Sequence, residues 1–296
     1  MRTAGAFFVG LLCLAARLSA QPAAPVAAPA TPSTAPVPEA VILVVAPGFP
    51  GTTAQAQPTM DLFAKALSAA AGRPAASLAT AYFESEAGGL AALAKPAARY
   101  ALVPLPYYLK HAGNPPLTPR LLVEEGGGTT QIWSLAAARG QVHGATGLAG
   151  WELTGTPGYS PGFVRMALAA WGALPADTRI TPTAGILSAL RRAAAGDAKV
   201  AVLLDRAQTA ALPSLPFASS LEIVATSPAL PSTLFCTLGK AAGDGADPVP
   251  GALLKLHETR EGAAALTAMR ITRFQPLDPG LMPPIRAGYA AAIAKP

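Results

Sequence analysis

The chain has 296 residues, of which 51% are hydrophobic and 13% charged, and its formal net charge is +6. Its basic residues are scattered, with only Arg191 and Arg192 adjacent, whereas nucleic-acid-binding proteins gather Lys and Arg on one face. We therefore exclude a nucleic-acid partner. A mildly positive chain suits an acidic small molecule.

The first twenty residues have the pattern of an export signal. Arg2 supplies a positive start, residues 6–16 (AFFVGLLCLAA) an apolar stretch too short to span a bilayer, and residues 18–20 (LSA) a cleavage site. A lipoprotein anchored through Cys13 would need a small residue before the cysteine, where Leu12 stands. We expect a signal peptide at residues 1–20 and a periplasmic protein.

Residues 21–38 (QPAAPVAAPATPSTAPVP) carry no charge, no aromatic residue and no periodic apolar pattern. Segments rich in Pro and Ala cannot bury a core and stay extended, which predicts a linker. The residues from Glu39 onward are enough for one large α/β domain or two ordinary lobes. Once Cys13 leaves with the signal, Cys236 is alone, and we expect it to be a small buried hydrophobic residue.

Beyond the linker, strand patterns alternate with helix patterns. Residues 41–47 (VILVVAP) form a β-branched run that ends in Pro-Gly, which is typical of a buried strand entering a loop. Thr59 can cap a helix over about residues 60–71. Strands are also predicted at residues 78–83 and 100–105, with a short helix at 88–94. This alternation favours a mostly parallel sheet with covering helices.

From Leu121 onward, short strand-like pieces are separated by glycine. The predicted strands are residues 121–123, 131–137, 148–153, 179–181, 200–204 and 221–225, and the predicted helices are 163–171 and 184–195. The last part contains a strand at 234–238 and helices around 251–256 and 261–269. We predict that residues 39–120 and 233–296 form lobe 1 and that residues 121–232 form lobe 2.

The start of the predicted helix at 163–171 has the composition of an anion site. Ser160 is a good N-cap, Pro161 suits the first helical position, and Gly162 lets a ligand approach closely. Helix N-termini bind oxyanions through free amides, and Thr154, Thr156 and Tyr159 add hydroxyls nearby. The alternative is an ordinary capped helix whose amides are met by Ser160 and water.

Several segments match one family in the same order. Residues 148–151 (LAGW) resemble the Leu-x-Gly-Lys that begins the second lobe of periplasmic phosphonate/phosphite-type substrate-binding proteins of ABC transporters. Residues 221–231 (LEIVATSPALP) resemble the segment through which that family returns to lobe 1. Residues 253–266 resemble its closing helices, and Phe274 stands where the family has the phenylalanine of a Gly-Phe pair. The likeness covers most of the chain after the linker.

The resemblance implies a two-lobed α/β fold, the type 2 periplasmic binding protein fold, in which each lobe is a mixed sheet flanked by helices. Members of the family close their lobes on a ligand. Ser160 and Gly162 match the Ser-Thr-Ser-Gly turn of the family, whereas Tyr159 and Pro161 stand where two serines would. Lys199 replaces an acidic residue that is usual at the start of a lobe-2 strand.

The resemblance also points to residues outside that turn. Tyr107 and Tyr108 follow a strand where the family has an aromatic loop facing the cleft, although two such tyrosines can equally pack the lobes together. Asp205 ends a strand whose end faces the cleft. The loop with Phe49 can contribute amides to the same cleft, or can be a tight turn. The predicted ligand-binding residues are thus Phe49, Tyr107, Tyr108, Thr154, Thr156, Tyr159, Ser160, Gly162 and Asp205.

The chain has no pattern of an enzyme or a metal site. His111, His143 and His257 lie in separate segments without a nucleophile motif or metal-ligand spacing. We expect no catalytic residue, no metal and no cofactor.

We therefore predict an exported solute-binding protein that captures a small anionic solute between two lobes and delivers it to an ABC permease in the membrane. We expect it to act as a monomer. The alternative is the same fold without a transport role, serving as a sensory or envelope interaction module, because the serine and acidic positions have changed.

Overall fold

The structure is a computed structural model that describes residues 38–49, 51–113, 115–196, 198–239 and 247–294. The predicted signal peptide, and the predicted linker except for Pro38, lie outside the described residues. Residues 36–296 form one compact unit, and the following description concerns this unit alone.

A six-stranded sheet has the strand order β13-β4-β12-β3-β1-β2. Its strands are β1 (Ala40–Val45), β2 (Leu78–Phe83), β3 (Ala98–Pro104), β4 (Leu117–Glu124), β12 (Thr233–Leu238) and β13 (Arg273–Pro276). The strands β2, β1 and β3 are parallel, whereas β12, β4 and β13 pair antiparallel. The alternating strands and helices from which a mostly parallel sheet was predicted are β1, β2 and β3, and these do pair parallel. The antiparallel pairs of β12, β4 and β13 make the whole sheet mixed.

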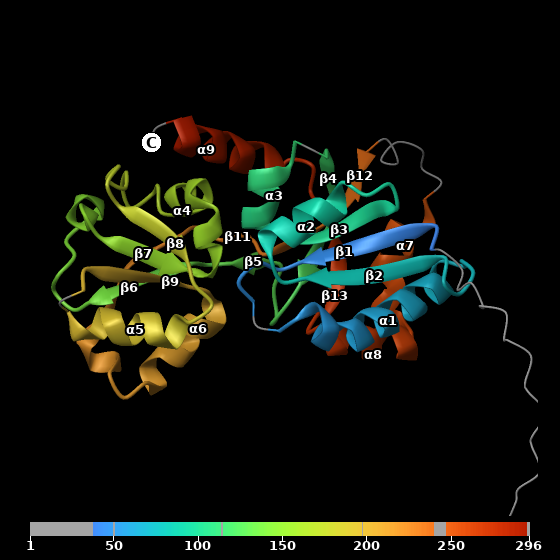
Figure 1. Cartoon of the computed structure of the whole chain (residues 1–296), viewed down its shortest axis with the longest axis horizontal. Coiled ribbons are helices and arrows are strands. Elements are labelled where there is room, and N and C mark those ends of the chain that lie inside the picture. The colour runs from blue at the N-terminus through green and yellow to red at the C-terminus, as the bar shows by residue number, and fades with distance from the viewer. Residues whose placement is uncertain (1–37, 50, 114, 197, 240–246, 295–296) are drawn as a thin grey trace, which may run out of the picture. The chain divides into compact units, whose positions relative to one another are not determined.

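Helices cover both faces of this sheet (Figure 1). They are α1 (Thr53–Ala70), α2 (Glu86–Leu93), α3 (Leu105–His111), α7 (Pro248–Lys255) and α8 (Arg260–Ala268). Helices α1, α7 and α8 share one apolar core with the sheet, including Phe63, Phe235 and Phe274. Helices α2 and α3 contribute to a second core on the other face. We call this sheet and its helices lobe 1.

A five-stranded sheet, β10-β6-β9-β7-β8, forms the second lobe, lobe 2. Its elements are β6 (Ser134–Ala138), β7 (Glu152–Gly155), α4 (Pro161–Ala167), β8 (Arg179–Pro182), α5 (Ile186–Ala195), β9 (Val200–Leu204), α6 (Arg206–Ala211) and β10 (Leu221–Thr226). All five residues of β9 are buried: Val202 and Leu204 pack with α5, and Ala201 and Leu203 belong to the core on the other face, which also contains residues of α4. This two-sided burial explains the uninterrupted apolar run VAVLL. Both lobes are mixed sheets flanked by helices, as predicted.

The chain crosses between the sheets twice, and the two crossings are hydrogen-bonded to each other. Strand β5 (Thr130–Gln131) pairs antiparallel with β11 (Leu230–Pro231). Next to this ribbon, the Trp133 amide donates to the Ser227 hydroxyl at 2.9 Å, and the Ser227 amide donates to the Trp133 carbonyl at 2.8 Å. Lobe 2 was predicted to span residues 121–232, so both crossings lie near the ends of that range. These lobe boundaries stay predictions.

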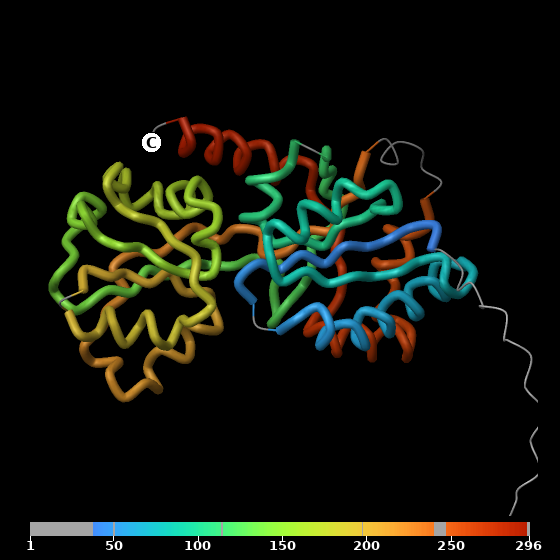
Figure 2. Tube along the Cα trace, in the orientation of Figure 1, coloured from blue at the N-terminus to red at the C-terminus, as the bar shows by residue number. Residues whose placement is uncertain are grey.

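Helix α9 (Met282–Ala294) is absent from the sequence-based prediction and follows β13 (Figure 2). Pro283 and Pro284 argue against a helix in a sequence pattern, but in the first turn their missing amides cost no intrahelical hydrogen bond. Met282 is buried, and Gly288 lies against Met166 of α4. Helix α9 therefore extends from lobe 1 onto lobe 2.

Several predicted boundaries shift. Helix α1 begins seven residues before the predicted start because Thr52 and Gln55 form a capping box, with the Gln55 amide 3.3 Å from the Thr52 hydroxyl. The predicted strand at 131–137 is divided into β5 and β6, and the one at 148–153 is η1 (Ala145–Leu148) followed by β7. The other 3-10 helices within the described residues are η2 (Thr156–Tyr159), η3 (Leu212–Ser214), η4 (Ala218–Ser220) and η6 (Leu256–Glu258). No helix in the described ranges is long and apolar enough to cross a membrane.

Candidate ligand-binding site

The turn η2 connects β7 to α4 and lies at the centre of the predicted site. Gly158 holds this turn tightly against β8, because a Cβ atom there would lie 2.0 Å from the Thr181 carbonyl oxygen. A glycine at this position is thus required by close backbone approach. The turn begins at Thr156 and ends at Tyr159, and each of these two residues belongs to a different part of the site.

Tyr159 belongs to a cluster of polar side chains from both lobes, here called the interlobe polar cluster: Glu86, Tyr107, Lys110, His111 and Tyr159. Lys110 Nζ donates to the Tyr159 carbonyl oxygen at 2.6 Å and lies 6.0 Å from the centroid of the Tyr159 ring. Glu86 Oε1 lies 2.6 Å from both Lys110 Nζ and His111 Nε2. The Tyr107 and His111 ring centroids are 4.7 Å apart. One lysine thus joins α2 and α3 of lobe 1 to η2 of lobe 2.

The surroundings in this cluster lower the pKa of Glu86 and raise the pKa values of the two tyrosines. Burial alone would raise the pKa of Glu86, but the hydrogen bonds and charges of Lys110 and His111 outweigh it, and the pKa is lowered. The pKa values of the Tyr107 and Tyr159 phenols are raised, first by burial and then by the Glu86 charge. Both phenols therefore stay protonated at neutral pH and can donate hydrogen bonds.

Four of the predicted site residues carry buried hydroxyls without a hydrogen-bond partner in the described part of the chain: Tyr107, Tyr108, Tyr159 and Ser160. Leaving such a group unpaired costs roughly 1–3 kcal/mol each, so a ligand or water that pairs with them is stabilising. The expectation that the Ser160 side chain caps α4 is wrong, since that hydroxyl accepts no bond from the first turn. The Ser160 hydroxyl is therefore available to another partner.

Thr156, at the other end of η2, lines an open pocket of about 320 Å³, here called the cleft pocket. Its walls come from the loop after β1, from η2, from the start of α5 and from α6: Gly48, Phe49, Thr156, Ala184, Gly185, Ile186, Leu187, Ser188 and Gln208. None of these residues is charged. The structure therefore brings Phe49 and Thr156 together in this pocket, while Tyr107 and Tyr159 meet in the interlobe polar cluster.

The other predicted site residues have structural partners. Thr154 donates to the Thr181 carbonyl at 3.1 Å, and Asp205 caps α6 by accepting from the Gln208 amide at 2.7 Å. Tyr108 lies with its ring 6.0 Å from the guanidinium of Arg286 on α9. Gly162 faces α9, where a Cβ atom would lie 2.4 Å from Ile293 Cγ2. The start of α4 is therefore partly covered on this side.

The sequence-based prediction missed Glu86, Lys110, His111 and Gln208. Residues 106–108 were expected in a loop, but Tyr107 lies on α3, and Lys110 and His111 follow it at helical spacing. This i, i+3, i+4 pattern was the available signal and depends on recognising the helix. Glu86 is the first residue of α2 and is distant in sequence, so no local pattern indicates it.

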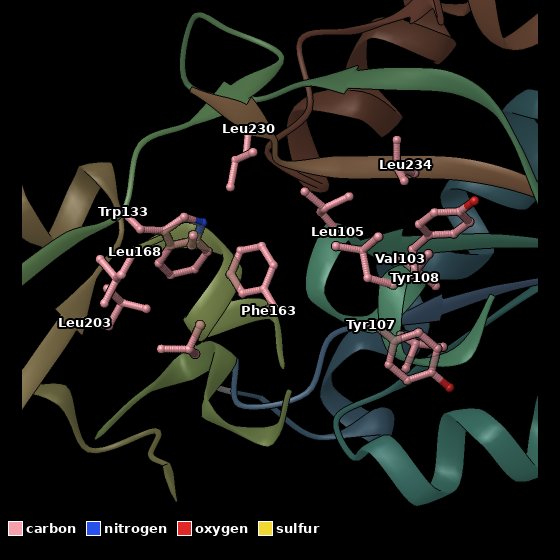
Figure 3. Packing of buried hydrophobic residues seen from close by; sticks show 14 of the residues in the cluster. Val103, Leu105, Tyr107, Tyr108, Trp133, Phe163, Leu168, Leu203, Leu230 and Leu234 are labelled. Atoms are coloured by element: carbon pink, nitrogen blue, oxygen red, sulfur yellow. The ribbon is translucent and has the colours of Figure 1, made fainter. Parts of the chain in front are cut away.

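An apolar layer surrounds these groups and connects the lobes. Figure 3 shows Trp133 and Phe163 on the side of lobe 2 and Leu105, Tyr107 and Tyr108 on the side of lobe 1. These residues belong to one continuous buried core, and the Trp133 and Phe163 rings meet edge to face at 5.8 Å. The unpaired hydroxyls therefore lie within a low-dielectric environment, in which hydrogen bonds to an anion are strengthened.

A family model described as "ABC transporter, phosphonate, periplasmic substrate-binding protein" matches residues 104–280. The chain belongs to this family. Its members are periplasmic substrate-binding proteins rather than enzymes, which confirms the family, the location and the non-enzymatic role that the sequence indicated. A search among curated protein sequences gave no match.

Solved structures support the two-lobed fold. The chain is similar to XAC2383 from Xanthomonas citri, solved with chloride and with ATP; for the chloride-bound form the TM-score is 0.67 and the identity 13%, covering 86% of this chain and 99% of that one. It is also similar to PhnD1 from Prochlorococcus marinus in complex with methylphosphonate, with a TM-score of 0.58, 13% identity and coverage of 86% and 99%. A phosphonate transporter binding component from Pseudomonas aeruginosa has a TM-score of 0.58, 14% identity and coverage of 86% and 87%. At these identities the comparisons concern the fold, and they confirm the predicted two-lobed architecture.

Proposed function

We propose that this protein captures a small anionic solute of the phosphonate or phosphate-like oxyanion class between its lobes and delivers it to an ABC permease. The observation that carries this proposal is the set of buried hydroxyls on Tyr107, Tyr159 and Ser160, which have no hydrogen-bond partner among the described residues. Tyr107 belongs to lobe 1, and the other two residues belong to lobe 2. A solute held by all three contacts both lobes and therefore stabilises the closed state.

An oxyanion suits these hydroxyls because its oxygens accept hydrogen bonds, and protonated phenols donate them. Lys110 adds a positive charge next to Tyr159, although it already pairs with Glu86. Family membership points to the same class of solute. The PhnD1 structure contains methylphosphonate, which makes this compound a suitable first probe.

Thermal unfolding of the purified protein tests this proposal. The panel comprises phosphate, phosphite, methylphosphonate, methanesulfonate, acetate and ATP, the last because XAC2383 was solved with it. A ligand at one hundred times its Kd adds about 2.7 kcal/mol to the unfolding free energy, which raises Tm by a few degrees. We expect a selective rise with a tetrahedral oxyanion. No shift with any compound would favour the alternative, an interaction module of the same fold.

Two serine variants separate a ligand contact from a structural one. We expect Ser160→Ala to weaken oxyanion binding at least about tenfold with little loss of stability, because its hydroxyl bonds nothing among the residues that the structure describes. The matched control is Ser227→Ala, whose hydroxyl accepts from the Trp133 amide at 2.9 Å. That change should lower stability by about 1 kcal/mol and leave the affinity unaltered. Equal affinities of Ser160→Ala and the wild type would remove Ser160 from the site.

A further inference from the structure

Helix α9 lies on both lobes at once. Near its start, Met282 is buried, and the guanidinium of Arg286 lies 6.0 Å from the centroid of the Tyr108 ring on α3 of lobe 1. Farther along, Gly288 lies against Met166 of α4 in lobe 2. A helix rises about 1.5 Å per residue, so the 13 residues of α9 span about 20 Å. This length carries α9 from one lobe onto the other (Figure 1).

The second half of α9, residues 288–294, packs on the start of α4 through apolar and small residues. A Cβ atom on Gly162 would lie 2.4 Å from Ile293 Cγ2 and 2.9 Å from Tyr289 Cε2. Glycine at position 162 thus lets the two helices approach closely. Tyr289 is only partly buried, and Ile293 is 56% exposed. Because this contact buries little apolar surface, the two helices can separate while each lobe stays folded.

The position of α9 couples this contact to movement of the lobes. The chain crossings at β5 and β11 form a ribbon about which two lobes can rotate. Helix α9 adds a further connection, which is non-covalent on the side of lobe 2. Because α9 follows β13 and is held at the buried Met282, it moves with lobe 1. Rotation of the lobes must therefore slide or detach residues 288–294 from α4.

We infer that α9 is a strap that fastens lobe 2 to lobe 1 before any solute is bound. With residues 288–294 on α4, the lobes stay together, and when these residues leave α4, the lobes open. The strap thus sets the balance between open and closed protein, which a solute then shifts. This role goes beyond the proposed capture of an oxyanion and does not depend on the identity of the solute.

Small-angle X-ray scattering of the unliganded protein tests the strap. Tyr289→Ala/Ile293→Ala removes the contacts with Gly162, and alanine preserves the helix. We expect the radius of gyration to increase by about 1 Å, because rigid lobes move apart when they open. Leu62→Ala is the matched control, since Leu62 is a 41% exposed apolar side chain on α1. It should leave the radius unchanged. A wild-type radius in Tyr289→Ala/Ile293→Ala would overturn the inference.

A disulfide between α9 and α4 provides the complementary test. In Met166→Cys/Gly288→Cys, the two new side chains are within disulfide reach, because a Cβ atom at position 288 would lie 3.5 Å from Met166 Cγ. A Cys13→Ser background removes one native thiol, and Cys236 is fully buried. We expect mild oxidation of the unliganded protein to form an intrachain disulfide. A disulfide that joins two chains, or none, would overturn the inference.

The two sets of substitutions combine into a rescue experiment. When the cysteine pair is added to Tyr289→Ala/Ile293→Ala, oxidation should restore the wild-type radius of gyration, and reduction should increase it again. A disulfide that forms without changing the radius would show that α9 does not control the opening of the lobes. Neither measurement uses a ligand, so failure of the strap leaves the proposed oxyanion function standing.

Discussion

The two ends of the turn η2 lie in very different surroundings. At Tyr159, the interlobe polar cluster is only partly buried and carries charged groups. Its Tyr107 and Tyr159 hydroxyls are themselves buried and have no partner within the described part of the chain. At Thr156, the cleft pocket is open, uncharged and flanked by exposed apolar side chains. One four-residue turn thus connects two regions that differ in charge, in burial and in hydrogen bonding.

The largest expected effect comes from breaking the turn that both regions share. In Gly158→Ala, the added Cβ atom would meet the backbone of β8, with the Thr181 carbonyl oxygen at 2.0 Å. Because backbone cannot move aside as a side chain can, we expect a loss of about 3 kcal/mol of unfolding free energy, measured by urea denaturation. Loss of oxyanion binding should accompany it.

A glycine with free space around it is the control for this variant. Gly251 lies in α7 with no atom within 4 Å of an added Cβ. Gly251→Ala should therefore raise the stability by about 0.5 kcal/mol, because alanine favours the helix. A stable Gly158→Ala protein with wild-type binding would contradict the close approach of η2 to β8.

A smaller effect is expected from removing the lysine of the interlobe polar cluster. Lys110→Met deletes the hydrogen bond to the Tyr159 carbonyl and the ion pair with Glu86. We expect a loss of about 1 kcal/mol and a larger radius of gyration in small-angle X-ray scattering, because a contact between the lobes is lost. Arg73→Met is the control: it removes the Arg73–Glu39 ion pair of 2.8 Å, which lies within lobe 1. An unchanged radius in Lys110→Met would show that this lysine does not hold the lobes together.

The smallest expected effect is a change in acid sensitivity. The folded pKa of Glu86 is lowered, so its ionised form stabilises the fold above its unfolded pKa, near 4.5. This contribution is lost as the pH falls through the folded pKa. Between pH 7 and pH 3, Glu86→Gln should therefore lose about 0.5 kcal/mol less stability than the wild type in urea denaturation. Identical pH profiles would mean that Lys110 and His111 do not stabilise the Glu86 carboxylate.

The regular parts of the fold could be predicted because their causes are local. The run VAVLL predicts a strand buried on both faces, and α5 ends at Gly196 with φ +81°, as its glycine indicated. Helix α9 could not be predicted, since its prolines resemble breakers and its stability comes from packing on α4. Helix α3 was missed because Tyr107 and Tyr108 were expected in an aromatic loop on the basis of the family resemblance.

The site was only partly predictable for a similar reason. Tyr107 and Tyr159 were both expected to bind the ligand, and the fold brings them into one cluster. Their assignment as ligand contacts remains a prediction. Lys110 contacts Tyr159 across 49 positions of sequence, and Glu86 contacts His111 across 25, which no periodicity can reveal. The role expected for the start of α4 also depended on a neighbour, α9, that the sequence did not indicate.

Tyrosine-to-phenylalanine variants test the central claim most directly, through the Kd for methylphosphonate and the unfolding free energy of the unliganded protein. Tyr107→Phe and Tyr159→Phe should each weaken binding at least about tenfold, with stability unchanged or raised by up to about 1 kcal/mol, because each removes an unpaired buried hydroxyl. Tyr100→Phe should leave the Kd for methylphosphonate unchanged and lower the unfolding free energy. Its hydroxyl bonds Asp247 at 3.0 Å in lobe 1, and the variant loses this hydrogen bond. Wild-type affinity in both Tyr107→Phe and Tyr159→Phe would contradict the claim that these hydroxyls bind the solute.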